Sequence, residues 1–411
     1  MSSSNPLHHK WRTLLLLATA ELLAMGLWFS ATAVLPALQA QWAISRAEAA
    51  WLTMAVQLGF VAGAVLSALF NVPDLWQPRN VMAVGAAVGA VLTAAIPFFV
   101  VGFRAAVVMR FGTGMALALV YPVGMKIMAT WTREDRGLGL GLLVGALTVG
   151  SASPHLIRAA GGIGSPDFVL YTAAAFAGLG AAIALRFGRP GPYRAAVPRF
   201  AWRQLGRAFL NRPLRLANIG YLGHMWELYA MWTWIPLYLV EAYRAGGAPA
   251  AQGNAPVLAA VAAFAVIAAG GLGSLAAGHL ADRWGRCNTT MLSMVTSGIC
   301  ALGIGCLFPH PALVTVVAVI WGFAVVADSA QFSTSVSELA DPEYMGTQLT
   351  AQTSMGFLLT LASIQLVPVV TDLVGWRWSF AFLAVGPVVG TWGMWLLKRS
   401  PESVRLAGGR R

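Results

Sequence analysis

The sequence is short of charged residues. Only 10% of its 411 residues are Asp, Glu, Lys or Arg, whereas 58% are hydrophobic. A soluble domain carries about 25% charged residues, so this chain cannot cover itself with a polar surface. Its mean hydropathy of +0.69 fits a lipid bilayer as the solvent. The composition therefore excludes an ordinary soluble protein.

Cysteine and catalytic motifs are also scarce. The three cysteines, Cys287, Cys300 and Cys306, have no paired spacing of the kind found in disulfide frameworks or metal sites. The chain has no G-x-x-x-x-G-K-[ST] phosphate loop, no H-E-x-x-H and no G-x-S-x-G. We therefore expect neither an ATP-driven pump nor an enzyme, and no metal or cofactor.

Long apolar runs are abundant instead. A helix that crosses a bilayer needs about 20 mostly apolar residues, and such runs occur at 13–36, 49–71, 81–101, 104–128, 137–160, 168–187, 214–240, 255–280, 289–308, 311–332, 347–371 and 376–397. The runs are continuous rather than alternating, which excludes a β-barrel. The sequence predicts an all-α membrane protein with 12 transmembrane helices.

The net charge of +12 is unevenly distributed. With an even number of spans, both chain ends and every even-numbered connection lie on one side. That side holds 20 of the 27 Lys and Arg residues, and the opposite side holds five. Positive residues collect in cytoplasmic loops, so we expect a multi-pass protein of the bacterial inner membrane with both termini cytoplasmic. Because topology accounts for the basic charge, we expect no nucleic-acid partner.

The two halves of the chain resemble each other. Residues 21–28 and 227–234 share the pattern E-L-x-A-M-x-x-W, and D-x-W-x-x-x-N occurs at 74–80 and 282–288. An even number of helices per repeat gives both copies the same orientation, related by an axis along the membrane normal. The sequence predicts two six-helix bundles with pseudo-twofold symmetry, residues 1–187 and 213–411, joined by a cytoplasmic linker at 188–212.

The linker is rich in arginine and proline. We expect a short amphipathic helix around Trp202–Phe209. Its arginines suit anionic lipid headgroups, although anchoring at the cytoplasmic face explains them more simply.

One motif is specific. Residues 278–286, G-H-L-A-D-R-W-G-R, resemble the G-x-x-x-D-R-x-G-R signature of the major facilitator superfamily, which lies between the second and third helices of each half. The resemblance covers the whole chain and implies that fold. It also implies a cytoplasmic gate formed by Asp74, Arg79, Asp282, Arg283, Gly285 and Arg286. The first-half copy has lost its glycines. We expect Asp282 to approach the start of the eleventh helix near Gly346, where unpaired N–H groups attract a carboxylate.

Four charged residues lie deep in apolar runs. Glu21, Arg110, Glu227 and Asp328 fall on the first, fourth, seventh and tenth helices, which the resemblance places around a central cavity. Buried charges in a membrane face water or one another. His224 lies one helical turn before Glu227. We expect these five residues to couple protons or bind substrate. The alternative is permanent ion pairing, of Glu21 with Arg110 or of Asp328 with an arginine.

We further expect the two carboxylates of the repeat to face each other across the bundle interface. Glu227 is the better candidate for coupling, because only its copy has His224, Tyr229 and Trp232 nearby. A cavity wall is predicted from Trp28, Tyr121, Tyr229, Trp232, Trp234, Gln331 and Gln352. Interfacial anchoring is the usual alternative for Trp and Tyr.

These features predict a monomeric secondary active transporter that moves a small solute by alternating access. We expect it to be coupled to protons, as a symporter or an antiporter. Arg110 favours a small organic anion, because a guanidinium binds anions through its planar fork. Glycines on the fifth helix partly resemble a motif of antiporters, which favours the alternative of proton-driven export of drugs or cations. A non-transporting membrane sensor is the alternative from another class.

Overall fold

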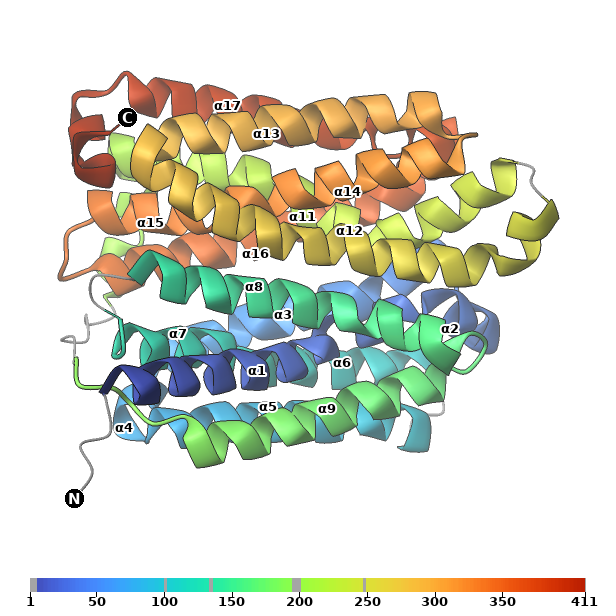
Figure 1. Ribbon diagram of the computed structural model, residues 1–411, viewed down its shortest axis with the longest axis horizontal. Coiled ribbons are helices and arrows are strands. Elements are labelled where there is room, and N and C mark those ends of the chain that lie inside the picture. Colours follow the sequence, from blue (N-terminus) through green and yellow to red (C-terminus); the bar gives the residue numbers. More distant parts are fainter. Residues whose placement is uncertain (1–5, 100–101, 133–135, 194–200, 247–248, 411) are drawn as a thin grey trace.

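The computed structural model describes residues 6–99, 102–132, 136–193, 201–246 and 249–410. Within these ranges the chain is helical and contains no strand (Figure 1). Continuous apolar sequence favours helices here because a helix satisfies all its backbone hydrogen bonds internally.

The first half of the chain forms one bundle. Its elements are α1 (Pro6–Ala33), α2 (Leu35–Trp42), α3 (Arg46–Leu69), α4 (Val72–Leu75), α5 (Pro78–Phe99), α6 (Phe103–Leu117), α7 (Tyr121–Ala129), α8 (Arg136–Ile157), the π-helix η1 (Arg158–Gly162) and α9 (Pro166–Phe187).

The second half follows two short turns, η2 (Trp202–Gln204) and α10 (Arg207–Leu210), which replace the single amphipathic helix expected in the linker. Its elements are α11 (Arg212–Ala245), α12 (Pro249–Trp284), α13 (Arg286–Gly303), η3 (Ile304–Leu307), α14 (Pro311–Ala327), α15 (Ser329–Leu339), α16 (Met345–Val374), η4 (Trp376–Trp378), η5 (Ala381–Ala384), α17 (Val385–Lys398) and η6 (Pro401–Gly409).

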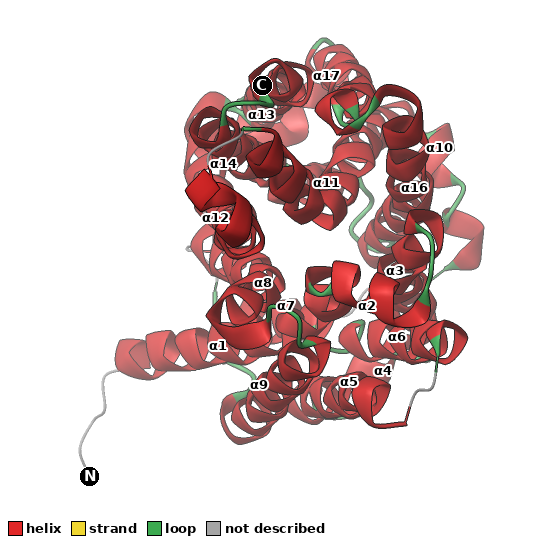
Figure 2. Cartoon of the chain, turned by 90° about the vertical axis from the view of Figure 1, so that its right-hand side faces the viewer, coloured by secondary structure: helices red, strands yellow, loops and turns green. Residues whose placement is uncertain are grey.

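The two bundles form two layers, with α1–α9 below and α11–α17 above in Figure 1. Both chain ends lie at the left edge of that view, together with α4 and the linker. We call this end of the molecule the termini side and the opposite end, which carries α2, the far side. Figure 2 looks at the molecule from the far side and shows the two groups of helices as separate bundles.

Among the described residues, 11 helices are long and apolar enough to cross a membrane. The remaining predicted span is α11, which is 34 residues long but carries more polar and charged side chains. It packs against α12, α16 and α17 within the second bundle. The predicted fold of two six-helix bundles is therefore confirmed.

Two predicted spans are interrupted in the middle. The span at 104–128 breaks between α6 and α7, where Pro122 stands near the start of α7 and cannot donate a helical hydrogen bond. The span at 311–332 breaks at Asp328, between α14 and α15. Non-helical backbone inside a membrane protein occurs where it is buried in protein or lines a cavity. Both breaks lie in helices that carry a buried charge.

Two helix pairs make most of the contact between the bundles: α8 with α12, and α3 with α16. Small residues allow close approach in the first pair. A Cβ atom added to Gly271 would lie 3.4 Å from the Cα atom of Gly145, and one added to Gly141 would lie 2.9 Å from Leu275. Backbone therefore faces backbone across part of the α8–α12 contact.

Candidate functional site

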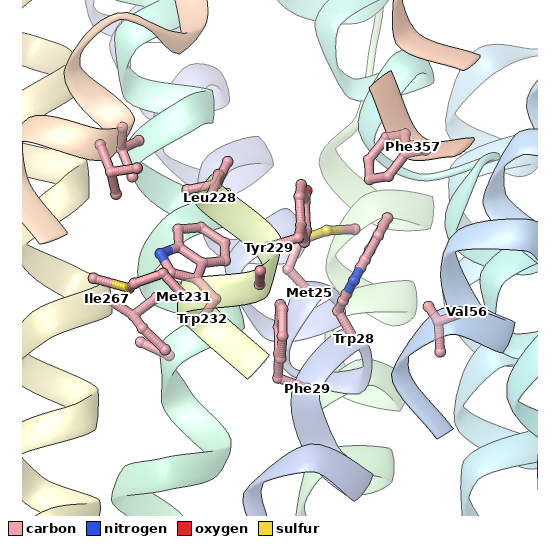
Figure 3. Close-up of a cluster of buried hydrophobic side chains, with 14 of the residues drawn as sticks. Met25, Trp28, Phe29, Val56, Leu228, Tyr229, Met231, Trp232, Ile267 and Phe357 are labelled. Atoms are coloured by element: carbon pink, nitrogen blue, oxygen red, sulfur yellow. The ribbon is translucent and has the colours of Figure 1, made fainter. Parts of the chain in front are cut away.

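A cluster of aromatic rings lies where the two bundles meet. We call it the aromatic layer; it consists of Trp28, Phe29, Phe60, Tyr229, Trp232 and Phe357, contributed by α1, α3, α11 and α16. Ring centroids are 5.5 Å apart between Trp28 and Phe357 and 5.7 Å apart between Phe29 and Trp232. Figure 3 shows Trp28 and Phe29 of one bundle facing Tyr229 of the other. The rings pack on one another and close the interface at this level.

Polar groups within and beside this layer lack partners. The indole Nε1 atoms of Trp28 and Trp232 are buried without a hydrogen bond among the described residues, and so is the amide nitrogen of Gln57. Each of these groups is a hydrogen-bond donor. A buried donor without an acceptor costs about 1–3 kcal/mol. The centre of the interface therefore presents flat apolar surface together with unused donors.

Two further contacts connect the bundles between the aromatic layer and the far side. Thr360 Oγ1 donates to Gln57 Oε1 at 2.6 Å, and both residues are fully buried. Arg46 Nη1 pairs with Asp372 Oδ1 at 3.0 Å, where both side chains are exposed. In this conformation the bundles are thus joined from their middle to the far side.

Arg110 does not pair with a carboxylate. Its fully buried guanidinium donates to the backbone oxygen of Leu27 at 2.8 Å, to that of Leu52 at 3.2 Å and to that of Trp28. It also donates to Ser30 Oγ at 3.2 Å. Arg110 therefore ties α1 and α3 together through backbone oxygens. The alternative Glu21–Arg110 pair is not formed among the described residues, because these acceptors occupy the guanidinium. The anion-binding role of Arg110 stays a prediction.

Glu21 points into the first bundle. A Cβ atom added to Gly124 of α7 would lie 2.9 Å from Glu21 Oε2, so the carboxyl group packs against that helix. Glu21 has no exposed surface, and neither of its oxygens has a hydrogen-bond partner among the described residues. An ionised carboxylate buried in this way would cost several kcal/mol, so this arrangement favours the neutral acid.

Glu227 points into the second bundle and is well satisfied. Its Oε2 atom accepts from Ser297 Oγ of α13 at 2.8 Å, and its Oε1 atom accepts from Trp321 Nε1 of α14 at 2.7 Å. Each of the two repeated carboxylates therefore faces the interior of its own bundle. The prediction that they face each other across the interface is wrong. Aromatic rings of α1 and α11 occupy that interface instead.

His224 pairs with Asp328 rather than with Glu227. Its Nδ1 atom lies 2.8 Å from Asp328 Oδ1, at an angle outside ordinary hydrogen-bond geometry, and its Nε2 atom lies 2.8 Å from Ser329 Oγ. His224 and Asp328 are buried, with 1% and 2% exposure. The predicted relay from His224 to Glu227 and the alternative Asp328–arginine pair are both replaced by this contact, which spans the break between α14 and α15.

The predicted cavity wall is only partly brought together. Trp28, Tyr229 and Trp232 belong to the aromatic layer. Tyr121 is half-buried at the start of α7, near the break in that span.

The other wall residues are engaged within the second bundle. Trp234 donates to the backbone oxygen of Ile364 at 3.0 Å, and Gln352 Nε2 donates to Asn218 Oδ1 at 3.0 Å. Gln331 accepts from Arg286 at 2.8 Å. In this structure each of the three side chains is held within the second bundle, and their place in a central cavity stays a prediction.

Comparison with known families matches residues 17–364 to the model described as Major Facilitator Superfamily. The chain belongs to this superfamily. It is a membrane transporter, and members of the superfamily are generally not enzymes. No curated protein matches the sequence significantly.

Solved structures of superfamily members have the same fold. A crystal structure of a mutant of the nucleoside transporter NupG aligns with a TM-score of 0.72 at 17% identity, covering 94% of this chain and 99% of that one. A bacterial homologue of the human lysosomal transporter Spinster, in an inward-facing and unoccupied conformation, aligns with a TM-score of 0.71 at 14% identity, covering 95% and 97%. At these identities the likeness shows the fold alone.

The superfamily motif at 278–286 lies on the termini side. Gly285 has a φ of 93°, a left-handed conformation that suits glycine at the turn between α12 and α13. Arg286 makes a bidentate pair with Glu338 at 2.6 and 2.8 Å. It therefore links the start of α13 to α15 within one bundle. Arg283 is exposed.

The expected approach of Asp282 to the start of α16 is not formed. Asp282 is exposed, and none of the hydrogen bonds between described residues joins its carboxylate to α16. The physical reason is the pairing of helices: α12 packs against α8, whereas α16 packs against α3. In the first-half copy, Arg79 donates to Gln77 at 3.1 Å, and the side chain of Asp74 lies outside the described residues.

Several central residues were not singled out from the sequence. Phe29, Phe60 and Phe357 read as ordinary apolar residues, and Gln57, Ser297, Trp321 and Thr360 read as isolated polar or aromatic residues in apolar helices. The repeat gave no signal for them because none of them lies within residues 21–28 or 227–234. The buried Gln57 is a polar side chain in the middle of α3 that could have indicated an interhelical contact.

Proposed function

We propose that this transporter is coupled to protons and carries a small, flat organic molecule that has hydrogen-bond acceptors and is neutral or cationic. The aromatic layer supports this proposal. Its rings offer stacking surface on both bundles, and the same rings attract cations. The unpaired donors of Trp28, Trp232 and Gln57 would be satisfied by carbonyl, ether or ring-nitrogen acceptors of a substrate.

The organic-anion interpretation has lost its main support. It required a free guanidinium in the centre of the protein, but Arg110 is fully buried and donates to backbone oxygens. The remaining buried ionisable groups in the middle of α1, α11 and the α14–α15 break include the carboxyl groups of Glu21, Glu227 and Asp328. A neutral or cationic substrate avoids repulsion from them.

We propose that Glu21 carries the coupling proton. None of the described residues donates a hydrogen bond to its carboxyl group, so nothing there stabilises a negative charge in this conformation. Separation of the bundles would admit water to this region and allow the proton to leave. Protonation would then favour the conformation described here over a more open one. Glu227 is less suited to this role, because Ser297 and Trp321 already stabilise its charged form.

We also propose that the termini side is cytoplasmic and that the protein resides in a bacterial inner membrane. The excess of Lys and Arg on that side supports this orientation. Labelling of single cysteines placed in the α9–α11 linker and in the loop between α2 and α3, on intact cells, tests it. Labelling of the linker position from outside would reverse the assignment.

Two indole donors allow a direct test of the substrate site. Purified protein is screened for thermal stabilisation by flat neutral, cationic and anionic compounds, and hits are measured for flux in proteoliposomes. Trp28→Phe and Trp232→Phe keep a ring but remove the donor, so we expect weaker binding, by about tenfold for each hydrogen bond lost. Trp234→Phe is the matched control, because its donor is used by Ile364.

Stabilisation confined to anions would overturn the substrate class. Equal binding by all three tryptophan variants would remove the aromatic layer as the binding site. The direction of the pH gradient that accelerates flux separates symport from antiport.

A further inference from the structure

A pocket lies on the termini side, away from the aromatic layer. It has a volume of about 360 Å³ and is lined by Arg207, Asn211, Asp341, Tyr344, Gln348 and Arg405, among others. Sites for small molecules typically range from about 300 to 1,000 Å³. Three separate segments meet here: the linker helix α10, the connection from α15 to α16, and the C-terminal turn η6.

Two arginines make the pocket attractive to an anion. The guanidinium of Arg207 lies over the ring of Tyr344, 5.7 Å from its centroid, which restricts its orientation. Arg405 makes one long contact, 3.4 Å, with the backbone oxygen of Ala340, which uses only one of its several N–H donors. Arginine is well suited to phosphate because its donors match two phosphate oxygens at once.

Acceptor groups line the same pocket. Gln348 is 2% exposed; its Nε2 atom donates to the backbone oxygen of Gln204 at 2.6 Å, whereas its Oε1 atom has no partner among the described residues. The amide orientation is fixed by the bond to Gln204. The Asp341 carboxylate is a second acceptor. A ligand that fits must therefore carry a hydrogen-bond donor beside its negative charge.

We propose that this pocket binds a phosphate ester whose alcohol part carries a hydroxyl or ammonium donor. The phosphate lies between Arg207 and Arg405, and the donor reaches Gln348 Oε1 or Asp341. Such a group occurs in phospholipid headgroups and in free phosphate esters. The side chains of Phe209 and Leu210, which follow Arg207 at the end of α10, are 51% and 81% exposed. The acyl chains of a lipid would cover such side chains.

Occupation of the pocket has a structural consequence. The linker already contacts α16 through a hydrogen bond from the backbone nitrogen of Ala201 to Thr347 Oγ1 at 3.0 Å. A ligand held by Arg207 and Arg405 at once would add a bridge from the linker to the C-terminal turn. The site is independent of the proposed substrate site.

The test uses full-length protein that has been stripped of lipid in detergent. Its thermal stability is measured with glycerol 3-phosphate, with inorganic phosphate, and after reconstitution into nanodiscs of phosphatidylglycerol or of phosphatidylcholine. We expect an increase in Tm of about 3 °C or more at saturation in the wild type. The response should be lost in the double variant Arg207→Gln, Arg405→Gln. The matched control, Arg189→Gln with Arg203→Gln, removes the same charge from exposed linker positions and should respond like the wild type.

The different ligands in this experiment distinguish a free phosphate ester from a lipid headgroup. A response to glycerol 3-phosphate supports a free phosphate ester, and a response only to phosphatidylglycerol supports a lipid headgroup. Equal responses of the pocket and control variants, or no response in any arm, would overturn the proposal. Native mass spectrometry of the wild type counts retained phospholipid and does not depend on how well the variants fold. The variant Gln348→Glu places a negative charge in the pocket and should weaken phosphate binding through charge repulsion.

Discussion

The two halves of this transporter place the same repeated glutamate in different surroundings. In the first bundle, Glu21 has no hydrogen-bond partner among the described residues. In the second bundle, Glu227 accepts from Ser297 and Trp321. The first bundle also contains the buried Arg110, which is satisfied by backbone oxygens, whereas the second contains the His224–Asp328 contact.

This difference shows how a duplicated helix can separate stability from function. A carboxylate that accepts two hydrogen bonds stabilises one packing of its bundle and resists a change of protonation. A carboxyl group without hydrogen-bond donors loses no hydrogen bonds to the protein when it exchanges its proton with entering water. Sequence similarity of the two segments therefore does not imply similar roles.

The variant Glu21→Gln is the most direct test of the different roles proposed for Glu21 and Glu227. Glutamine has nearly the same shape but cannot exchange a proton, so we expect proton-driven flux in proteoliposomes to fall to the level of empty liposomes. Counterflow without a pH gradient should persist, and thermal stability should change little. If proton-driven flux continued at the wild-type rate, Glu21 would not be the coupling residue.

The next largest effect is expected for Arg110→Ala. Removal of the guanidinium takes away its hydrogen bonds to buried backbone oxygens of α1 and α3, and a hydrogen bond to a charged group is worth about 1.5–3 kcal/mol. We expect a marked loss of thermal stability together with reduced transport. Arg110→Lys keeps the charge and should recover only part of both losses, because one ammonium cannot reach all the acceptors. Arg104→Ala, an exposed arginine on the same helix, is the control.

The variant Glu227→Gln tests whether Glu227 stabilises the second bundle rather than carrying the coupling proton. The amide offers one acceptor oxygen, so either Ser297 or Trp321 loses its partner and the fold loses about 1–3 kcal/mol. We expect a lower Tm with proton-coupled flux retained in the molecules that remain folded. Glu241→Gln, at the far end of the same helix, controls for the loss of charge. A complete loss of coupling at wild-type stability would return Glu227 to the coupling role.

The smallest effects are expected for contacts that join the two halves. Thr360→Val removes the buried bond to Gln57, worth about 0.5–1.5 kcal/mol, and should shift the conformational equilibrium toward separation on the far side. Asp372→Asn removes an exposed ion pair, worth below about 1 kcal/mol, and its effect should disappear at high salt. Fluorescence energy transfer between labels on α2 and η4 measures both shifts. Equal shifts for the two variants would contradict the ranking by burial.

Much of the fold could be predicted from the sequence, because apolar run length and the distribution of arginine depend on general properties of the bilayer. The duplication and the motif at 278–286 added the two-bundle arrangement. The site could be predicted only in part. Sequence places Glu21, Arg110 and Glu227 at membrane depth, but the direction of each side chain depends on helix rotation and on neighbours such as Gly124 and Trp321.

The pairing of Arg110 shows why this limit is physical. A guanidinium can be satisfied by a carboxylate or by several backbone oxygens, and both solutions use the same residue at the same depth. Only the three-dimensional positions of Leu27 and Leu52 decide between them. Likewise, the interface is filled by phenylalanines that have no distinguishing pattern in sequence.

The glycine contact between α8 and α12 is also a place where the protein could be fixed in one conformation. Where Gly145 meets Gly271, two backbones touch with little side-chain interlocking, so the bundles can shift there without side chains having to disengage. A disulfide between cysteines placed at positions 145 and 271 would link the two backbones and hold this arrangement of the bundles for crystallisation or for selection of conformation-specific antibodies.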